Sequence, residues 1–168
     1  MMNPKILGRM AKMNELPLAK EQSCGCGGCT CERGEVKPIF HKHLLINAKV
    51  TSPMRSEDEA VGFLKRLVEN IDMKIIKGPF ASYVDKPGNR GLTAIVMIET
   101  SHIAFHIWDE KDPALVQFDL YTCGSLNVDQ VLALFNETFQ VVELDYLHLD
   151  RENGFNVEDQ AVRVQPAN

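Results

Sequence analysis

Three strand-like segments follow one another in the middle of the chain with only a few residues between them. Residues 92–100, 102–110 and 115–123 alternate apolar and polar side chains, except for the continuously apolar centre of the first segment. A period of two is typical of β-strands. With a turn at residues 111–113, the three segments predict successive antiparallel strands. This run constrains the fold more than any other part of the sequence.

Two amphipathic helices are expected on either side of this run. Ser56 and Glu59 have the spacing of a capping box that opens one helix, and residues 125–139 form a second helix with Asn127 as its cap. The sequence therefore predicts an α+β fold, a two-layer sandwich in which two helices cover one face of an antiparallel sheet. The other face must pack against something else. Further strands are expected at residues 41–50, 73–84 and 141–149.

The sequence divides into three parts. Residues 1–37 are an N-terminal extension rich in cysteine and glycine, residues 38–150 hold the expected strands and helices, and residues 151–168 are a polar C-terminal tail, which we expect to be loose. Four thiolates in the extension could wrap one soft metal ion. Zinc sites use two separated cysteine pairs, however, and this cluster has no second half, so we favour free cysteines and no metal. The four residues are Cys24, Cys26, Cys29 and Cys31.

Composition argues against several classes of function. The net charge is −5, so nucleic acid is not an expected partner. No apolar run is long enough to span a membrane, and the N-terminus lacks the pattern of a secretory signal. The five cysteines do not have the spacing of a disulfide framework, which favours a reducing cytoplasm.

The junction between the first two central strands is unusual. The apolar run of residues 95–98 ends in three polar residues, 99–101, with neither glycine nor proline among them. Taken alone, these residues would be ordinary turn material, and His106 would be a core histidine. The combination of Ser101, His106 and a lone cysteine, Cys123, at the end of the third strand favours a functional site.

The pattern Ser-His-Ile-x-x-His-x-Trp-x-Glu at residues 101–110, followed by Asp-Leu-Tyr-Thr-Cys-Gly at residues 119–124, resembles the bacterial and archaeal S-adenosylmethionine decarboxylases. The resemblance covers roughly residues 42–150, and it is specific because it joins two separated blocks. Members of this family make their own pyruvoyl cofactor by self-cleavage. The resemblance implies a homodimer, in which the partner covers the open sheet face, and a role in supplying aminopropyl groups for spermidine synthesis.

The resemblance also implies cleavage between Thr100 and Ser101, with Ser101 becoming the pyruvoyl group. Ser101 Oγ would attack the Thr100 carbonyl to give an ester, and loss of the Ser101 α-proton would then release the Thr100 carboxylate. His106 would assist this elimination, and Thr93 matches a processing hydroxyl that is serine in the family. The family has glutamate where Thr100 stands, but the acyl shift uses only the backbone carbonyl.

Four residues are expected to act on the substrate. A Schiff base with the pyruvoyl ketone would accept the electrons released with carbon dioxide, and Cys123 would protonate the α-carbon; most lone cysteines are simply small buried side chains. By resemblance, Glu110 would bind the ribose. Tyr83 would stack on the adenine, although a core aromatic is about as good an interpretation. Asn47 stands where the family has an acidic residue near the ribose.

Two alternatives stay open. Asn47 and the loop at residues 85–91 favour a pyruvoyl decarboxylase of a smaller amino acid, such as ornithine or arginine. Thr100 favours a homologue that never cleaves and acts by binding a partner.

Overall fold

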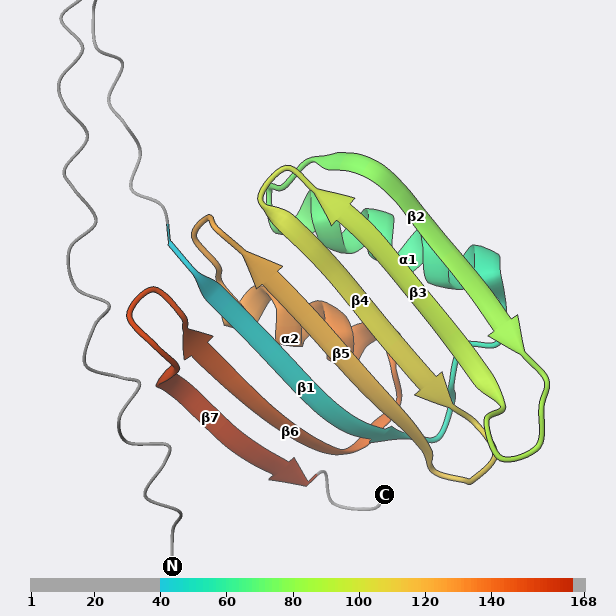
Figure 1. Cartoon of the computed structure of the whole chain (residues 1–168). Coiled ribbons are helices and arrows are strands. Elements are labelled where there is room, and N and C mark those ends of the chain that lie inside the picture. The colour runs from blue at the N-terminus through green and yellow to red at the C-terminus, as the bar shows by residue number, and fades with distance from the viewer. Residues whose placement is uncertain (1–39, 165–168) are drawn as a thin grey trace, which may run out of the picture. The chain divides into compact units, whose positions relative to one another are not determined.

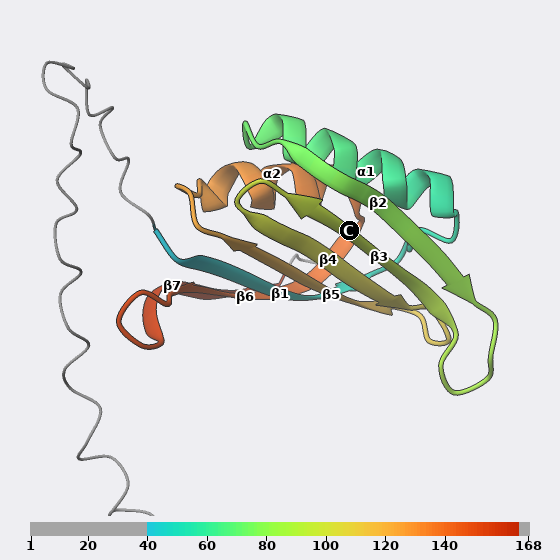
Figure 2. The same ribbon diagram turned by 45° about the horizontal axis from the view of Figure 1, so that its top comes forward.

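The computed structural model describes residues 40–164, which form one seven-stranded sheet and two helices (Figure 1). The strands pair antiparallel in the order β2-β3-β4-β5-β1-β6-β7. Both helices lie against the same face of the sheet, as Figure 2 shows. In chain order the elements are β1 (Lys42–Val50), α1 (Glu57–Asn70), β2 (Ile75–Val84), β3 (Gly91–Ile98), β4 (Ser101–Trp108), β5 (Ala114–Thr122), α2 (Val128–Thr138), β6 (Val141–Asp150) and β7 (Asn156–Val164).

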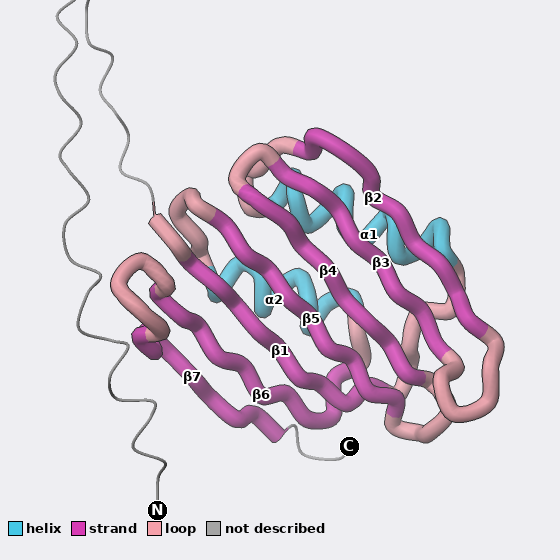
Figure 3. The backbone as a smooth tube through the Cα atoms, viewed as in Figure 1, coloured by secondary structure: helices cyan, strands magenta, loops and turns pink. Residues whose placement is uncertain are grey.

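This arrangement confirms the predicted α+β fold with an antiparallel sheet and two helices on one face. Each predicted strand and both predicted helices are present, and no predicted end is displaced by more than three residues. The two helices sit behind different parts of the sheet, α1 behind the β2–β3 side and α2 behind β5 and its neighbours (Figure 3).

The predicted loose tail over residues 151–168 is wrong for Asn156–Val164, which form β7 and pair with β6. Strand β7 lies at the edge of the sheet and carries Glu158, Asp159 and Gln160 in succession. An edge strand is held by backbone hydrogen bonds to one neighbour and tolerates charged side chains. It therefore lacks the apolar alternation by which strands are recognised in a sequence.

The helices begin where their capping residues predict. Ser56 Oγ accepts a hydrogen bond from the Glu59 N–H at 3.4 Å, and Asn127 Oδ1 accepts one from the Gln130 N–H at 3.3 Å. Each helix buries one apolar face against the sheet, where burial of a large side chain contributes roughly 1.5–3 kcal/mol. Four phenylalanine rings meet at the centre of this core: Phe63, Phe105, Phe135 and Phe139.

Side chains along each central strand alternate between the helix-covered face and the face away from the helices, which we call the open face. On β4, Ile103, Phe105 and Ile107 are buried, whereas the residues between them are half-buried on the open face. The open face also holds exposed apolar side chains, such as Ile95 (43% exposed) and Met97 (47%). No other element in residues 40–164 covers this face.

A buried carboxylate fixes the end of β4. Asp109 is 4% exposed and accepts hydrogen bonds from Arg90 Nε (2.8 Å), from Tyr83 Oη (3.0 Å) and from Arg55 Nε. Burial by itself raises the pKa of this carboxyl, but the three donors outweigh burial and hold its pKa below 3.8. Asp109 therefore ties the loop before α1 and the β2–β3 loop to the end of β4.

We expect Asp109→Ala to lower the free energy of unfolding by about 3 kcal/mol, because it removes an acceptor shared by charged donors. Since the pKa of Asp109 is depressed on folding, its contribution is full above about pH 4 and is lost as the pH falls through the lowered pKa. Urea unfolding at pH 7 and pH 3 measures both effects. Asp112→Ala, in the exposed turn nearby, is the control and should change stability little.

Candidate functional site

The turn between β3 and β4 places backbone strain at Ser101. Ile98 pairs with Ser101, so the hairpin loop consists of Glu99 and Thr100 alone. The φ angle of Ser101 is +149°, a value that residues with a side chain rarely adopt. Such a residue stores on the order of 1–3 kcal/mol of strain. The strained residue is the serine on the C-terminal side of the predicted cleavage bond.

The carbonyl before this serine is held by a backbone donor. The Cys123 N–H donates to Thr100 O at 2.8 Å, and the Cys123 carbonyl accepts from the Phe40 N–H at 3.0 Å. An N–H aimed at a carbonyl stabilises the negative charge that develops when the carbonyl is attacked. The Thr100 side chain is turned away, since its hydroxyl lies 3.5 Å from Met73 Sδ. The structure thus brings Thr100, Ser101 and Cys123 together, with Cys123 a free, half-buried thiol.

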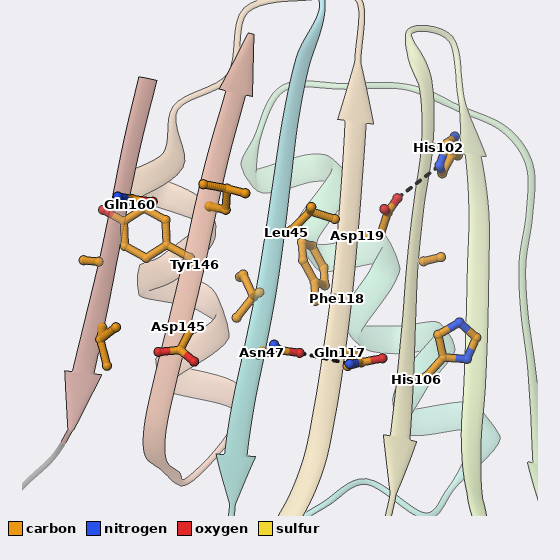
Figure 4. Close-up of a pocket in the computed structure, with 15 residues that line it drawn as sticks. Leu45, Asn47, His102, His106, Gln117, Phe118, Asp119, Asp145, Tyr146 and Gln160 are labelled. Atoms are coloured by element: carbon orange, nitrogen blue, oxygen red, sulfur yellow. Dashed lines mark hydrogen bonds and ion pairs between the residues drawn. The ribbon is translucent and has the colours of Figure 1, made fainter. Parts of the chain in front are cut away.

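A chain of polar side chains starts at the Ser101 hydroxyl. Ser101 Oγ lies 3.1 Å from His102 Nδ1, and His102 Nε2 lies 3.1 Å from Asp119 Oδ1. Asp119 Oδ2 lies 2.7 Å from His43 Nε2, and Arg151 Nη1 lies 3.2 Å from His43 Nδ1. Figure 4 shows the contact between Asp119 and His102 across β5 and β4.

Sequence reasoning missed four members of this chain. His102 follows Ser101 directly, so the sequence could have identified it as a candidate site residue. Asp119 and His43 become neighbours of His102 only through the pairing of β4, β5 and β1. Arg151 is the residue directly after β6, and its side chain contacts His43. Burial by itself raises the pKa of Asp119, but the hydrogen bonds and charges of His43 and His102 outweigh it and lower its pKa.

A second polar group lies farther along the open face. Thr93 Oγ1 is 3.0 Å from His106 Nδ1, and Gln117 Nε2 donates to Asn47 Oδ1 at 3.0 Å. Strand pairing sets these residues in one row across β3, β4, β5 and β1. His106 is five residues from Ser101 on β4, which is about 16 Å in an extended strand. Within one chain, His106 and Thr93 therefore do not reach the Thr100–Ser101 bond.

A trough of about 1060 Å³ on the open face joins the two groups. His102 and Asp119 line one part of it, and His106, Gln117 and Asn47 line another (Figure 4). The trough is large enough for a ligand of several hundred daltons.

Two predicted substrate residues lie outside this trough. Tyr83 packs on the core on the helix side, where burial and then the Asp109 carboxylate raise its pKa. This placement supports the interpretation of Tyr83 as a structural aromatic. Glu110 lies in the turn after β4, where its Oε1 accepts from the Gly88 N–H at 2.6 Å, and it lines a separate pocket of about 280 Å³.

Neither a metal site nor a membrane span is found in the described part of the chain. Residues 40–164 contain no group of three histidine, cysteine or acidic side chains arranged to hold a metal ion. Neither α1 nor α2 is long and apolar enough to cross a membrane. The four cysteines at positions 24–31 lie outside the described residues, so the prediction that they are free stays a prediction.

Comparison with known proteins shows the family of the chain. The sequence profile of the S-adenosylmethionine decarboxylase family matches residues 42–152. An S-adenosylmethionine decarboxylase proenzyme from Archaeoglobus fulgidus is 32% identical over 115 residues, which cover 67% of this chain and 98% of the relative. The proenzyme of the same name from Pyrococcus horikoshii is 33% identical over 81 residues, or 48% of this chain and 55% of the relative. The residues matched by the family profile include the strained Ser101, Cys123, whose N–H donates to the carbonyl before that serine, and most of the residues that line the trough. The chain therefore belongs to the S-adenosylmethionine decarboxylase family.

Proposed function

We propose that the protein is a self-cleaving, pyruvoyl-dependent decarboxylase of S-adenosylmethionine that supplies the aminopropyl donor for spermidine synthesis. The observation that carries the proposal is the strained Ser101, preceded by a carbonyl that already accepts a hydrogen bond from the Cys123 N–H. The relatives are named as proenzymes, which is consistent with a maturation step.

Cleavage would use groups that are already in place. Ser101 Oγ attacks the Thr100 carbonyl carbon, the Cys123 N–H stabilises the resulting oxyanion, and the bond from Thr100 to the Ser101 nitrogen breaks to leave an ester. Loss of the Ser101 α-proton then expels the Thr100 carboxylate and leaves an enamine. The enamine becomes an imine, and water converts it to a pyruvoyl group at position 101 with release of the Ser101 nitrogen as ammonia. Release of the strain at Ser101 favours the first step.

The residues around Ser101 fit the pyruvoyl group that would form there. When formed, this group supplies the electron sink that decarboxylation requires. The Cys123 thiol, held next to Ser101 by the pairing of β4 with β5, would deliver a proton to the substrate α-carbon. A reducing cytoplasm would keep this thiol available.

The separation of the two polar groups on the open face supports a homodimer. Ser101 and His106 lie about 16 Å apart along β4, so one chain alone does not combine them. A second copy, packed on the open face and related by a two-fold axis, would place its His106 and Thr93 next to Ser101 and His102 of the first copy. The exposed Ile95 and Met97 on this face would be buried in the same contact.

The family resemblance implies ribose contacts by Glu110 and Asn47, although Glu110 lines a separate pocket in the single chain. These contacts predict opposite effects of two substitutions on the Michaelis constant. Glu110→Gln should raise the Michaelis constant for S-adenosylmethionine several-fold, and Asn47→Glu should lower it by a similar factor. Each change exchanges a charged and a neutral hydrogen-bond acceptor, a difference of about 1 kcal/mol. Steady-state carbon dioxide release measures both constants. Glu137→Gln, exposed on α2, is the control, and equal constants for all variants would remove Glu110 and Asn47 from the site.

The mass of the purified protein tests the proposed function. We expect two fragments, residues 1–100 and residues 101–168, the second with a pyruvoyl N-terminus, and a native mass of twice their sum. A single uncleaved mass after prolonged incubation would overturn the proposal in favour of a binding homologue. Release of carbon dioxide from ornithine or arginine, but not from S-adenosylmethionine, would show that the proposed substrate is wrong.

A further inference from the structure

We propose that His102 is the base that takes the proton from Ser101 Oγ in the first step of self-cleavage, and that Asp119, His43 and Arg151 hold it in the tautomer that this step needs. The inference rests on the proposed self-cleavage and concerns the proton of its first step, which the family motif does not assign.

The direction of each hydrogen bond follows from Arg151. A guanidinium can only donate, so His43 Nδ1, 3.2 Å from Arg151 Nη1, must accept. The proton of a neutral His43 then lies on Nε2, which donates to Asp119 Oδ2 at 2.7 Å. An ionised carboxylate only accepts, so His102 Nε2 donates to Asp119 Oδ1 at 3.1 Å. The free electron pair of His102 is therefore on Nδ1.

This electron pair faces the hydroxyl that must lose its proton. His102 Nδ1 lies 3.1 Å from Ser101 Oγ, within the reach of a general base. The arrangement of hydroxyl, imidazole and carboxylate is the one that activates serine in other nucleophilic sites. Neighbouring side chains of a regular strand point to opposite faces of the sheet. The positive φ of Ser101 departs from regular strand geometry, and its hydroxyl contacts the next side chain, His102.

The step balances without any further reactant. Ser101 Oγ forms a bond to the Thr100 carbonyl carbon while its proton moves to His102 Nδ1. The carbonyl oxygen becomes an oxyanion bonded to the Cys123 N–H. When the carbon–nitrogen bond breaks, the Ser101 nitrogen takes up the proton from His102, and an ester and a free amine remain.

Packing around His102 keeps the group in place. Arg151 lies over the ring of Tyr121, with its guanidinium carbon 4.7 Å from the ring centre, and the His43 ring meets the same tyrosine edge-on. The side chain of His43 is 15% exposed and that of His102 is 42% exposed. In the single chain, His102 is therefore more exposed than His43.

The test follows cleavage of newly synthesised full-length chain over time by mass. His102→Gln should slow cleavage at least about 100-fold, a typical contribution of a general base. Added imidazole should restore part of the rate in His102→Ala, because truncation leaves a space for an imidazole ring beside Ser101 Oγ. Cleavage of either variant at the wild-type rate, without imidazole, would overturn the assignment.

Hydroxylamine identifies the step that is blocked, because it cuts an ester much faster than an amide. Uncleaved His102→Gln should resist hydroxylamine, since no ester has formed at position 101. Uncleaved His106→Ala should instead be cut there, since in our proposal His106 acts after the ester. An ester in His102→Gln at the wild-type level would overturn the role of His102.

Matched carboxylate variants test the orienting role of Asp119. Asp119→Asn should slow cleavage strongly and resist hydroxylamine, whereas Asp119→Glu, which keeps the carboxylate, should recover part of the rate. Asp85→Asn, in the exposed β2–β3 loop and outside the lining of the trough, is the control and should cleave normally. Equal rates for Asp119→Asn and wild type would overturn the inference about Asp119. If wild-type protein never cleaves, the proposed function fails first, and this inference fails with it.

Discussion

Ser101→Ala should remain a single uncleaved chain with no detectable decarboxylation. The hydroxyl is the only proposed nucleophile, and without it neither the ester nor the pyruvoyl group can form. The substitution removes the contact of Ser101 Oγ with His102 Nδ1 but keeps the Thr100 carbonyl in place, because that carbonyl accepts its hydrogen bond from the backbone of Cys123 and not from a side chain. Intact mass and carbon dioxide release from S-adenosylmethionine measure the two losses on one sample.

Ser82→Ala is the matched control for this experiment. Ser82 is an exposed serine on the edge strand β2, and its variant should cleave and turn over as wild type does. If Ser101→Ala were cut between residues 100 and 101, or if wild type were active while still whole, Ser101 would not be the source of the cofactor.

Cys123→Ala should separate maturation from turnover. Its backbone N–H still donates to Thr100 O, since that contact does not involve the thiol, so cleavage should proceed. Decarboxylation of S-adenosylmethionine should fall about 100-fold or more, because the proposed proton donor to the α-carbon is missing. Fragment masses and the initial rate of formation of the decarboxylated product measure the two effects.

Two outcomes would contradict this assignment of Cys123. Normal product at the wild-type rate from cleaved Cys123→Ala would show that another group donates the proton. A whole, folded Cys123→Ala chain would mean that the side chain itself is needed for cleavage, and Cys123→Ser would then tell whether a hydroxyl can replace it.

The secondary structure and the chemical candidates were accessible from the sequence. Alternation along residues 92–123 and the caps at Ser56 and Asn127 are local signals, set by residues that are close in the chain, and the elements that they predicted are present. The two separated motifs that contain Ser101 and Cys123 resemble those of the S-adenosylmethionine decarboxylases, and this resemblance was enough to select the cleavage bond as a hypothesis. Strand β7 was missed because it does not alternate apolar and polar residues. It is an edge strand held by its backbone pairing with β6.

Only the tertiary structure decided which of these residues meet. Strand periodicity assigns a side chain to a face, but a shift of pairing by two residues would preserve every face and change every neighbour. The observed register bonds Cys123 to the Thr100 carbonyl and aligns His102 with Asp119. The extended backbone of β4 keeps His106, five residues farther along the strand, about 16 Å from Ser101. Contacts between distant segments arise from the packing of the whole sheet, and no local pattern in the chain encodes them.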